Sequence, residues 1–298
     1  MILLWGVTDD PPLAAVQRAM ERRGANYLLL DQRQAPADYA FRFGAVVEGR
    51  LGGVDLARVS SAYVRPQDVV DDDRARRLEA LLASWLELSP IPVLNRFSAQ
   101  ASNTSKLLQA RLIQAQGFAV PPSLATTDPR AARAFVARHG AVIYKSLSSV
   151  RSIVRRLKPC ELGRLDAVVS CPTQFQRYIP GVDYRVHVVD GQAFGVRIDS
   201  HSDDYRYDAG AGLAPADLPP DLQARCVALA RALGLRLAGI DLRLDPDGAW
   251  HCFEVNPSPG FSCFEPEGDE PIATAVADLL IAAPALPSSA RCPPGRSW

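Results

Sequence analysis

The sequence predicts an α/β protein in which an N-terminal domain with a parallel sheet precedes two further lobes. Residues 1–95 alternate short apolar runs with segments of helical periodicity, which is the pattern of a small parallel α/β domain. From Gly181 onward the apolar runs are joined by tight turns, as in antiparallel sheets. With 298 residues and 48% hydrophobic content, the chain can bury more than one core.

The elements of the N-terminal domain follow from its apolar spacing. Strands are expected at residues 2–7 and 27–30. Between them Leu13, Val16 and Met20 fall at helical spacing, and Gly24 stands where that helix would end. Further strands at residues 46–47 and 62–64 and a helix over 74–88 complete this domain. The chain has no GxGxxG sequence, so a dinucleotide-binding fold is not predicted.

Two lobes and a tail follow. In residues 96–180, a helix over 102–116 carries Leu107, Leu108, Leu112 and Ala115 on one side. The rest of this lobe contains a helix over Pro129–His139, a strand over 141–145, and closing segments at 168–171 and 174–179. Residues 181–284 contain strands at 184–189 and 193–198, a helix over 221–233, a hairpin described below and a helix over 272–282. Residues 285–298 are rich in Pro, Ser and Arg and are expected to form a flexible tail.

Composition permits an enzyme and argues against two classes of partner. Lys plus Arg equals Asp plus Glu at 33 each, so no basic excess favours a nucleic-acid surface. No apolar run is long enough to span a membrane, and residues 1–7 lack the basic start of a signal peptide. The six cysteines form no CxxC pair, which suits unpaired thiols in a reducing cytoplasm. The oligomeric state is left open, and a homodimer is compatible with the sequence.

The segment from Gly239 to Gly260 is the most informative part of the chain. Alternating apolar and polar residues on either side of Asp245-Pro-Asp-Gly248 predict a β-hairpin. Phe253 and Val255 are expected on one face of its second strand, with Glu254 and Asn256 on the other. If Asp241 shares the face of these two polar residues, two carboxylates and an amide oxygen converge, which suits Mg²⁺. The alternative is a solvated polar face on an ordinary hairpin.

The order Asp241, then Glu254-x-Asn256-Pro-Ser-Pro-Gly, resembles the metal-binding end of the ATP-grasp ligases. It is similar above all to the branch that holds the ribosomal-protein glutamate ligase and the ATP-grasp maturases of ribosomal peptides. The resemblance extends from about Asn95 to Glu265. It implies an ATP-grasp fold, in which an N-terminal parallel-sheet α/β domain precedes two lobes that clasp ATP and Mg²⁺.

Two lysines match the family's phosphate contacts. Lys106 lies in the first turns of a helix, where a solvated surface lysine is the alternative, and Lys145 ends a buried strand, where a charge needs a partner. In the family such ammonium groups neutralise the polyphosphate. The loop Ser146-Leu-Ser-Ser-Val-Arg-Ser152 departs from the family because it lacks the usual glycines.

The resemblance also assigns residues downstream of this loop. Gln176, Arg177, Tyr178 and Ile179 correspond to the interlobe hinge that contacts adenine, mainly through its main chain, although relatives usually have Glu where Arg177 stands; an ordinary edge strand is the alternative. The match continues through Asp183 to Arg185, which corresponds to an arginine facing the phosphates or the acyl intermediate. Arg197, on the next strand, is expected to point into the same site. Asp204 and Arg206 resemble a substrate-contacting element of the maturases, with a solvated charge run as the alternative.

The reaction that the resemblance implies has two steps. A substrate carboxylate attacks the γ-phosphate to give an acyl phosphate and ADP, and an amine or hydroxyl then displaces phosphate. Three functions remain open: a ligase acting on an acidic peptide, a ligase acting on a small carboxylate, and a non-catalytic ATP-binding regulatory protein. Arg65 and Arg206 are expected as free cations that bind the substrate acid.

Overall fold

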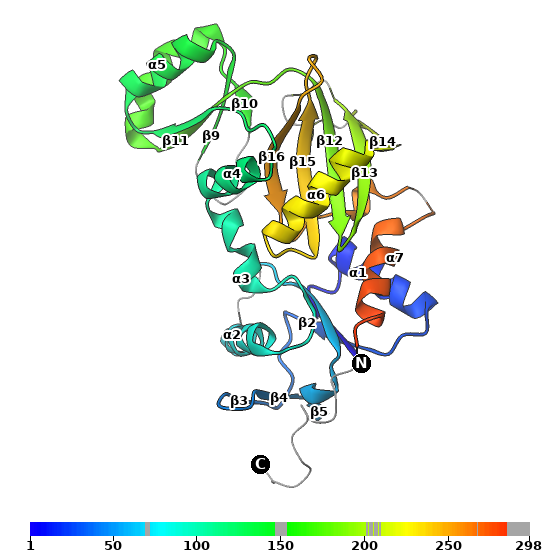
Figure 1. Ribbon diagram of the computed structural model, residues 1–298. Coiled ribbons are helices and arrows are strands. Elements are labelled where there is room, and N and C mark those ends of the chain that lie inside the picture. Colours follow the sequence, from blue (N-terminus) through cyan, green and yellow to red (C-terminus); the bar gives the residue numbers. More distant parts are fainter. Residues whose placement is uncertain are drawn as a thin grey trace.

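The structure is a computed structural model that describes residues 1–68, 72–146, 154–200, 202, 205, 208, 210–266 and 268–284. Within these residues the chain forms a parallel N-terminal sheet, a small antiparallel sheet attached to it, and two further antiparallel sheets (Figure 1). Among the helices of this described part, none has both the length and the apolar character needed to cross a membrane.

The N-terminal sheet is parallel, as predicted. Its strands have the order β2-β1-β6-β7 and comprise β1 (Ile2–Gly6), β2 (Tyr27–Asp31), β6 (Ser61–Arg65) and β7 (Val93–Leu94). Side chains of β1 alternate between two cores, because successive residues of a strand point to opposite faces. Ile2 and Leu4 contact the core formed with α1 (Pro11–Arg22) and α7 (Pro271–Ile281). Leu3 and Trp5 pack on the other face, against α2 (Asp73–Leu88).

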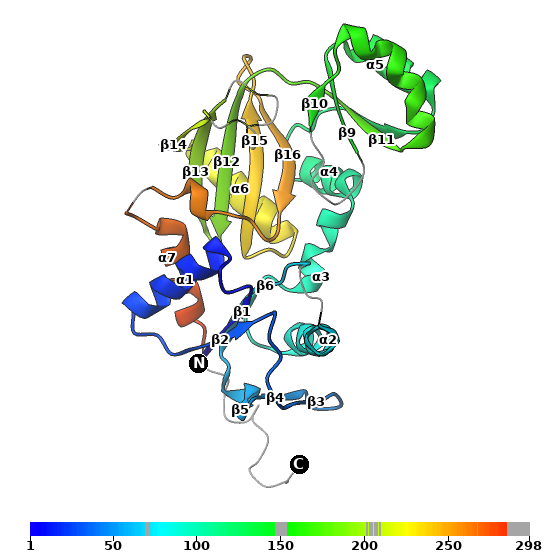
Figure 2. The same cartoon turned by 180° about the vertical axis from the view of Figure 1, so that it is seen from behind.

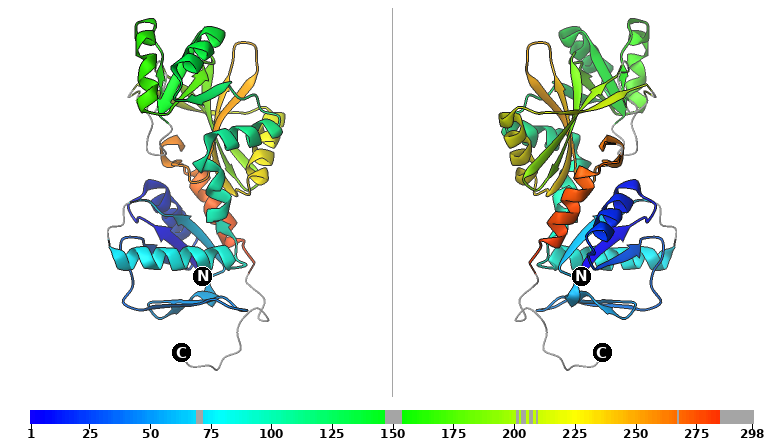
Figure 3. Two further views of the ribbon diagram at one scale, coloured as in Figure 1. Left: turned by 90° about the vertical axis from the view of Figure 1, so that its left-hand side faces the viewer. Right: turned by 90° about the vertical axis from the view of Figure 1, so that its right-hand side faces the viewer.

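Helix α7 connects the end of the described chain to its beginning. It packs beside α1 (Figures 1 and 2), and Arg18, Arg22 and Arg23 of the first helix region form ion pairs with Glu270 and Asp278. Figure 3 shows α7 running between the N-terminal sheet and the large sheet. The apolar side of α7 therefore completes the core of the N-terminal lobe. The expected lobe boundaries instead group this helix with residues 181–284.

A small antiparallel sheet was not predicted. It consists of β3 (Tyr39–Arg42), β4 (Glu48–Leu51) and β5 (Val54–Asp55), followed by the short helix η1 (Leu56–Arg58). The strand expected at residues 46–47 is wrong. These residues lie just before β4, and Val46 is exposed. The sheet packs through Leu51 and Leu56 on the α2 side of the parallel sheet.

The sheet of residues 123–177 has the order β10-β9-β11-β8. Its strands are β8 (Ser123–Thr126), β9 (Val142–Ser146), β10 (Arg155–Arg156) and β11 (Thr173–Arg177). Helices α5 (Pro129–His139) and η3 (Pro159–Ser170) pack through Val142 and Phe175 on one face of it. Residues 168–170, expected among the closing segments of this lobe, instead form the last turn of η3, whose Val168 enters this core.

The largest sheet is five-stranded and antiparallel, with the order β14-β13-β12-β15-β16. Its strands are β12 (Val182–Val189), β13 (Gln192–Asp199), β14 (Gly212–Ala216), β15 (Leu237–Leu244) and β16 (Trp250–Asn256). Helix α6 (Pro220–Ala232) covers one face, where Val186, Ile240 and Val255 meet Leu222 and Leu229. We call the opposite face of β12, β15 and β16, which carries Asp183, Arg185, Asp241, Arg243 and Glu254, the polar face.

Helix α4 (Lys106–Ala115) lies beside the edge strand β16 (Figures 1 and 2), after α3 (Phe97–Gln100) and η2 (Ala101–Thr104). The apolar side that the sequence predicted for this helix is not its buried side. Leu107, Leu108 and Leu112 are exposed, whereas Gln109 and Ile113 are buried. The reason is that Gln109 bonds to the backbone of β16, which turns the leucines outward.

Asn95 joins the N-terminal lobe to the large sheet through a buried amide. Its Nδ2 donates to the carbonyl oxygens of Leu237 and Pro257, at 2.6 Å each, and its Oδ1 accepts from the amides of Arg236 at 2.9 Å and Leu237 at 3.2 Å. All hydrogen-bonding positions of this amide group are therefore used within the protein.

We expect Asn95→Ala to lower the free energy of unfolding by at least about 2 kcal/mol, because it leaves several buried main-chain groups without partners. Urea denaturation at a constant m-value measures this change. Gln34→Ala, at an exposed position of the same lobe, is the control and should change stability by less than about 0.5 kcal/mol. Equal stability of the two variants would contradict the role of Asn95 as a joint.

Candidate active site

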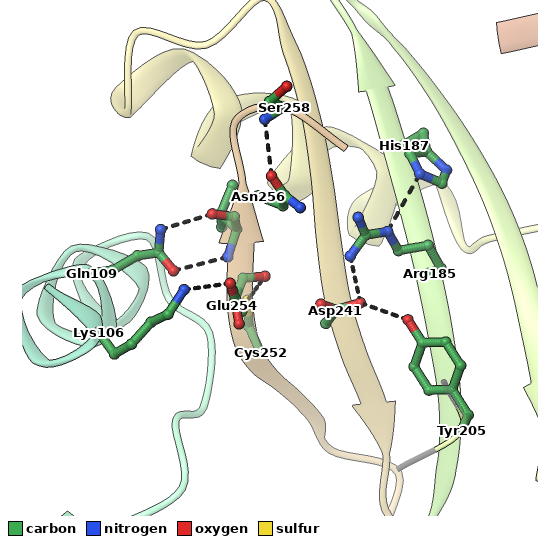
Figure 4. Close-up of polar contacts among 11 residues, drawn as sticks. Lys106, Gln109, Arg185, His187, Tyr205, Asp241, Cys252, Glu254, Asn256 and Ser258 are labelled. Carbon is green, nitrogen blue, oxygen red and sulfur yellow. Dashed lines mark hydrogen bonds and ion pairs between the residues drawn. The ribbon is translucent and has the colours of Figure 1, made fainter. Parts of the chain in front are cut away.

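The hairpin of β15 and β16 brings the predicted oxygen ligands together. Asp245 begins its turn, where the amide of Gly248 donates to the Asp245 carbonyl at 3.1 Å and Gly248 has a positive φ of 85°. The register pairs Asp241 with Glu254 and Gly239 with Asn256. Directly paired residues of an antiparallel sheet share a face, so Asp241, Glu254 and Asn256 all lie on the polar face (Figure 4).

A β-bulge interrupts β16 just before Glu254. The register passes from Asp241 opposite Glu254 to Leu242 opposite Cys252, so Phe253 is the extra residue. Cys252 and Val255 are consequently the residues buried against α6. The expectation that Phe253 lies on the same face as Val255 is wrong: its ring centre lies 5.3 Å from the guanidinium carbon of Arg243, a residue of the polar face.

The buried side chain of Arg185 forms an ion pair with the partly exposed carboxylate of Asp241. Its Nη1 lies 2.6 Å from Asp241 Oδ1, and the arginine is only 5% exposed. The hydroxyl of Tyr205 also donates to this carboxylate oxygen, at 3.4 Å. The guanidinium of Arg185 thus places a positive charge beside the predicted metal ligand Asp241, on the polar face.

Arg197 does not join this group. It is paired in the sheet with Tyr184, whereas Arg185 is paired with Val196. The side chain of Arg197 therefore lies on the α6 face, at its exposed margin, and forms an ion pair with Asp199 at 2.8 Å. The expectation that Arg197 points into the same site as Arg185 is wrong.

His187 is a buried hydrogen-bond partner of Arg185. It is fully buried, and its Nε2 accepts from Nε of Arg185 at 3.3 Å. Burial, together with the positive charge of Arg185, holds the pKa of His187 well below its usual range. The ring is therefore neutral and able to accept this hydrogen bond. The signal in the sequence was its position two residues after Arg185, on the same face.

Helix α4 reaches the other carboxylate. The ammonium of Lys106 contacts Glu254 Oε1 (Figure 4). It also donates to Asn103 Oδ1 at 2.8 Å. The side-chain amide of Gln109, one turn later, bonds to the backbone of Val255. Each predicted carboxylate ligand thus has a cation beside it: Arg185 for Asp241 and Lys106 for Glu254.

Lys145 lies on β9, directly opposite Gln174 of β11. Its neighbours Tyr144 and Phe175 pack against the helical side of this sheet, so Lys145 and Gln174 belong to the other face. Its contact with phosphate stays a prediction. Residues 147–152 of the expected phosphate loop, as well as Asp204 and Arg206, lie outside the described residues.

The predicted hinge is held by internal contacts. The main-chain amides of Arg177 and Tyr178 donate to the carbonyls of Pro122 and Ala141, at 2.9 Å each. Gln176 donates to Ser123 Oγ at 3.1 Å, and the Arg177 side chain is exposed. The Ile179 carbonyl accepts from Arg243 at 2.8 Å. The role of this segment toward adenine stays a prediction.

Asp183 and Tyr178 surround Arg243. The guanidinium of Arg243 pairs with both carboxylate oxygens of Asp183 at 2.7 Å and lies 5.7 Å from the Tyr178 ring centre. Arg156 covers the same ring at 3.8 Å. Asp183 therefore holds Arg243 against the hinge, which is a positioning role; direct contact with the nucleotide stays a prediction.

Arg65 is a structural arginine, contrary to the expectation of a free cation. It is 7% exposed, and its Nε lies 2.5 Å from Asp10 Oδ2. Its Nη1 donates to the Pro259 carbonyl at 2.8 Å and to Ser258 Oγ at 3.2 Å. Arg65 thus anchors the loop that follows Asn256, whose Oδ1 accepts from the Ser258 amide at 2.9 Å.

The donor set on the polar face fits a hard divalent cation. The side chains of Asp241 and Glu254 remain 27% and 31% exposed, and Asn256 adds an amide oxygen that retains a second lone pair. Carboxylate and amide oxygens are ligands that Mg²⁺ accepts. The third donor here is an amide, and the described residues contain no cluster of three or more His, Cys, Asp or Glu side chains suited to a metal.

Comparison with known proteins finds similar chains. A model of the RimK-like ATP-grasp domain matches residues 104–280. Among curated proteins, a D-alanine–D-alanine ligase of Synechococcus sp. (strain JA-3-3Ab) is 29% identical over an alignment of 186 residues, and the match covers 55% of this chain and 57% of that ligase. The chain thus covers little more than half the length of this relative.

Solved structures are similar over nearly the whole chain. One is the ATP-grasp ligase PsnB with a phosphomimetic variant of a minimal precursor, Mg and ADP. It has a TM-score of 0.80 at 27% identity, and the match covers 95% of this chain and 98% of PsnB. A RiPP-associated ATP-grasp ligase from Chryseobacterium gregarium, with ADP and a leader and core peptide, has a TM-score of 0.80 at 21% identity, covering 94% and 96%. The macrocyclase MdnC from Microcystis aeruginosa MRC, bound with the precursor peptide MdnA, has a TM-score of 0.77 at 22% identity, covering 94% and 99%. At these identities, the likeness to the last two is one of fold.

Proposed function

Because the chain belongs to the family of RimK-like ATP-grasp domains, we propose that it is an ATP-dependent ligase that activates a carboxylate of a peptide substrate. The ATP-grasp fold expected from the sequence is confirmed by this family match and by the likeness to PsnB. The observation that carries the proposal is the polar face, where Asp241, Glu254 and Asn256 lie together with Arg185 and Lys106.

In this proposal ATP lies between the lobes of residues 96–180 and 181–284. The segment Gln176–Ile179 contacts adenine, and Lys106, Lys145 and Arg185 offset negative charge on the phosphates. Mg²⁺, held by Asp241, Glu254 and Asn256, would supply further neutralisation of phosphate oxygens when bound. The described residues of the site supply charge and orientation; the carboxylate of the substrate is itself the nucleophile.

The products follow from conservation of atoms. A substrate carboxylate oxygen bonds to the γ-phosphorus while the bond to the β,γ-bridging oxygen breaks, which releases ADP. An amine or hydroxyl of the acceptor then bonds to the acyl carbon, loses a proton and displaces phosphate. This leaves an amide or an ester.

Two features favour a peptide over a small substrate. PsnB, solved with its minimal precursor, matches 95% of this chain, whereas the D-alanine–D-alanine ligase matches 55%. The N-terminal lobe is also included in the match to PsnB. A ligase of a small carboxylate and a non-catalytic ATP-binding protein remain the alternatives. The unpaired described cysteines suit the further proposal that the protein works in the cytoplasm.

We expect ATP turnover in the presence of an accepted peptide to yield ADP and phosphate rather than AMP and pyrophosphate. The test incubates the protein with ATP, Mg²⁺ and a panel of Asp- and Glu-rich peptides, with D-alanine and glutamate as the small-acid arm. Hydroxylamine should trap the activated carboxylate as a hydroxamate, seen by mass spectrometry. AMP as the nucleotide product would refute the acyl-phosphate mechanism, and turnover with only the small acids would favour the alternative ligase.

A further inference from the structure

On the outer edge of β16, backbone groups form hydrogen bonds with a loop residue and a side chain in place of a neighbouring strand. β16 is the last strand of the five-stranded sheet, so the backbone groups on its outer side need other partners. Near its start, the amide of Cys252 donates to the carbonyl of Ala119 at 2.9 Å, in a short parallel bridge between Ala119 and His251. Beyond the bulge at Phe253, the partner is a side chain.

That side chain is Gln109, which imitates the backbone of a strand. Its Nε2 donates to the carbonyl of Val255 at 2.7 Å, and its Oε1 accepts from the amide of Val255 at 3.0 Å (Figure 4). Gln109 is only 1% exposed, so water cannot readily replace either bond. The two bonds fix both peptide planes of Val255.

Val255 is the residue between the two predicted ligands of β16. Its own side chain is fully buried against α6, which anchors it from the opposite face. Because the directions of Glu254 and Asn256 follow from the peptide planes on either side of Val255, fixing that backbone also fixes the two side chains. The bulge directly before Glu254 makes such fixing necessary, since a bulge weakens the regular ladder.

We propose that Gln109 is a positioning residue that sets the geometry of Glu254 and Asn256 for metal binding. This inference rests on the proposed function. Lys106, Gln109 and Ile113 lie at helical spacing on the side of α4 that faces β16, so the lysine and the backbone clamp belong to one rigid helix. Helix α4 therefore places the cation and both ligands relative to one another.

The test measures metal binding directly. Mn²⁺ is titrated into the protein with saturating ADP and followed by electron paramagnetic resonance, and ADP affinity without metal is measured separately by calorimetry. Gln109→Met keeps the side-chain length but loses both hydrogen bonds. We expect it to weaken Mn²⁺ binding by about tenfold or more, with metal-free ADP affinity unchanged within about twofold, since it touches no predicted adenine contact. Gln114→Met, the same substitution at an exposed position of α4, should leave Mn²⁺ binding unchanged.

Gln109→Glu is the second variant, in case Gln109→Met does not fold. It keeps an acceptor for the Val255 amide but loses the donor to the Val255 carbonyl. Its added negative charge would by itself tighten cation binding, so weaker Mn²⁺ binding would have to come from displaced ligands. Amide hydrogen exchange of residues 250–258 should rise in both variants.

The possible results separate the inference from the function on which it rests. If wild-type protein binds no Mn²⁺ in the presence of ADP, the ligase proposal fails and this inference fails with it. If wild-type protein binds Mn²⁺ and both Gln109 variants bind it equally well, Gln109 merely caps an edge strand and the inference alone is overturned. An equal loss of metal-free ADP affinity in the folded variants would also overturn it, because the whole site would then be displaced.

Discussion

Glu254→Gln is expected to reduce metal-supported ATP turnover by roughly a hundredfold to a thousandfold. The substitution removes a charged oxygen ligand and leaves Lys106 without its counter-charge. Because the Glu254 side chain is 31% exposed and on the polar face, the fold should be preserved. Phosphate release with an accepted substrate measures turnover, and a thermal melt checks the fold.

The matched control is Glu270→Gln. Glu270 also forms ion pairs, with Arg18 and Arg22, but it lies at the start of α7, away from the polar face. This variant should retain wild-type turnover. Unchanged turnover in Glu254→Gln would remove Glu254 from the predicted metal site, and an equal loss in both variants would point to a general effect of lost charge.

Arg185→Met is expected to lower the free energy of unfolding by about 1–3 kcal/mol. The substitution removes the ion pair of Asp241 with Arg185 and the donor to the buried Nε2 of His187. It also removes a positive charge that depresses the pKa of His187, so this pKa should rise toward its usual value. Urea denaturation measures the stability, and NMR titration of the imidazole measures the pKa.

Arg197→Met is the matched control for Arg185→Met. The two arginines lie on neighbouring strands, but the Arg197 side chain is 50% exposed and paired with Asp199 on the other face. Its loss should change stability by less than about 0.5 kcal/mol. Arg185→Lys, which keeps the charge, should recover part of the stability and serves if Arg185→Met does not fold. Equal effects of Arg185→Met and Arg197→Met on stability would refute the importance of the ion pair between Arg185 and Asp241.

The turn and the alternation of the metal hairpin were sufficient to predict the two strands, but not their shared polar face. Asp245-Pro-Asp-Gly248 fixes the connection, and a regular ladder from this turn would pair Asp241 with Phe253; only the bulge brings Asp241 opposite Glu254. The bulge at Phe253 could not be predicted, because a one-residue insertion leaves no mark in a short apolar-polar pattern. It places Cys252, rather than Phe253, in the core.

Two errors had different origins. Arg197 could have been excluded from the sequence, since the turn at Asp190-Gly191 pairs Val189 with Gln192 and hence Tyr184 with Arg197. The buried side of α4 could not have been found by hydrophobic spacing. Its inward residues include Lys106 and Gln109, whose partners lie on a strand almost 150 positions later, at Glu254 and Val255. Polar side chains that bind distant backbone are invisible to an amphipathic pattern.

The packing of α7 on the N-terminal sheet constrains the order in which the chain can fold. The core that contains Ile2, Leu4 and Leu13 also contains Ile272, Val276 and Leu280. On the ribosome the first lobe emerges long before residues 271–281 are synthesised. Until then, one face of its sheet lacks the apolar contacts that α7 provides. Closing this core also requires bringing together segments separated by most of the chain, which is slow for entropic reasons. Complete folding of the N-terminal lobe therefore waits for the synthesis of α7, and nascent chains that end before α7 should remain sensitive to protease.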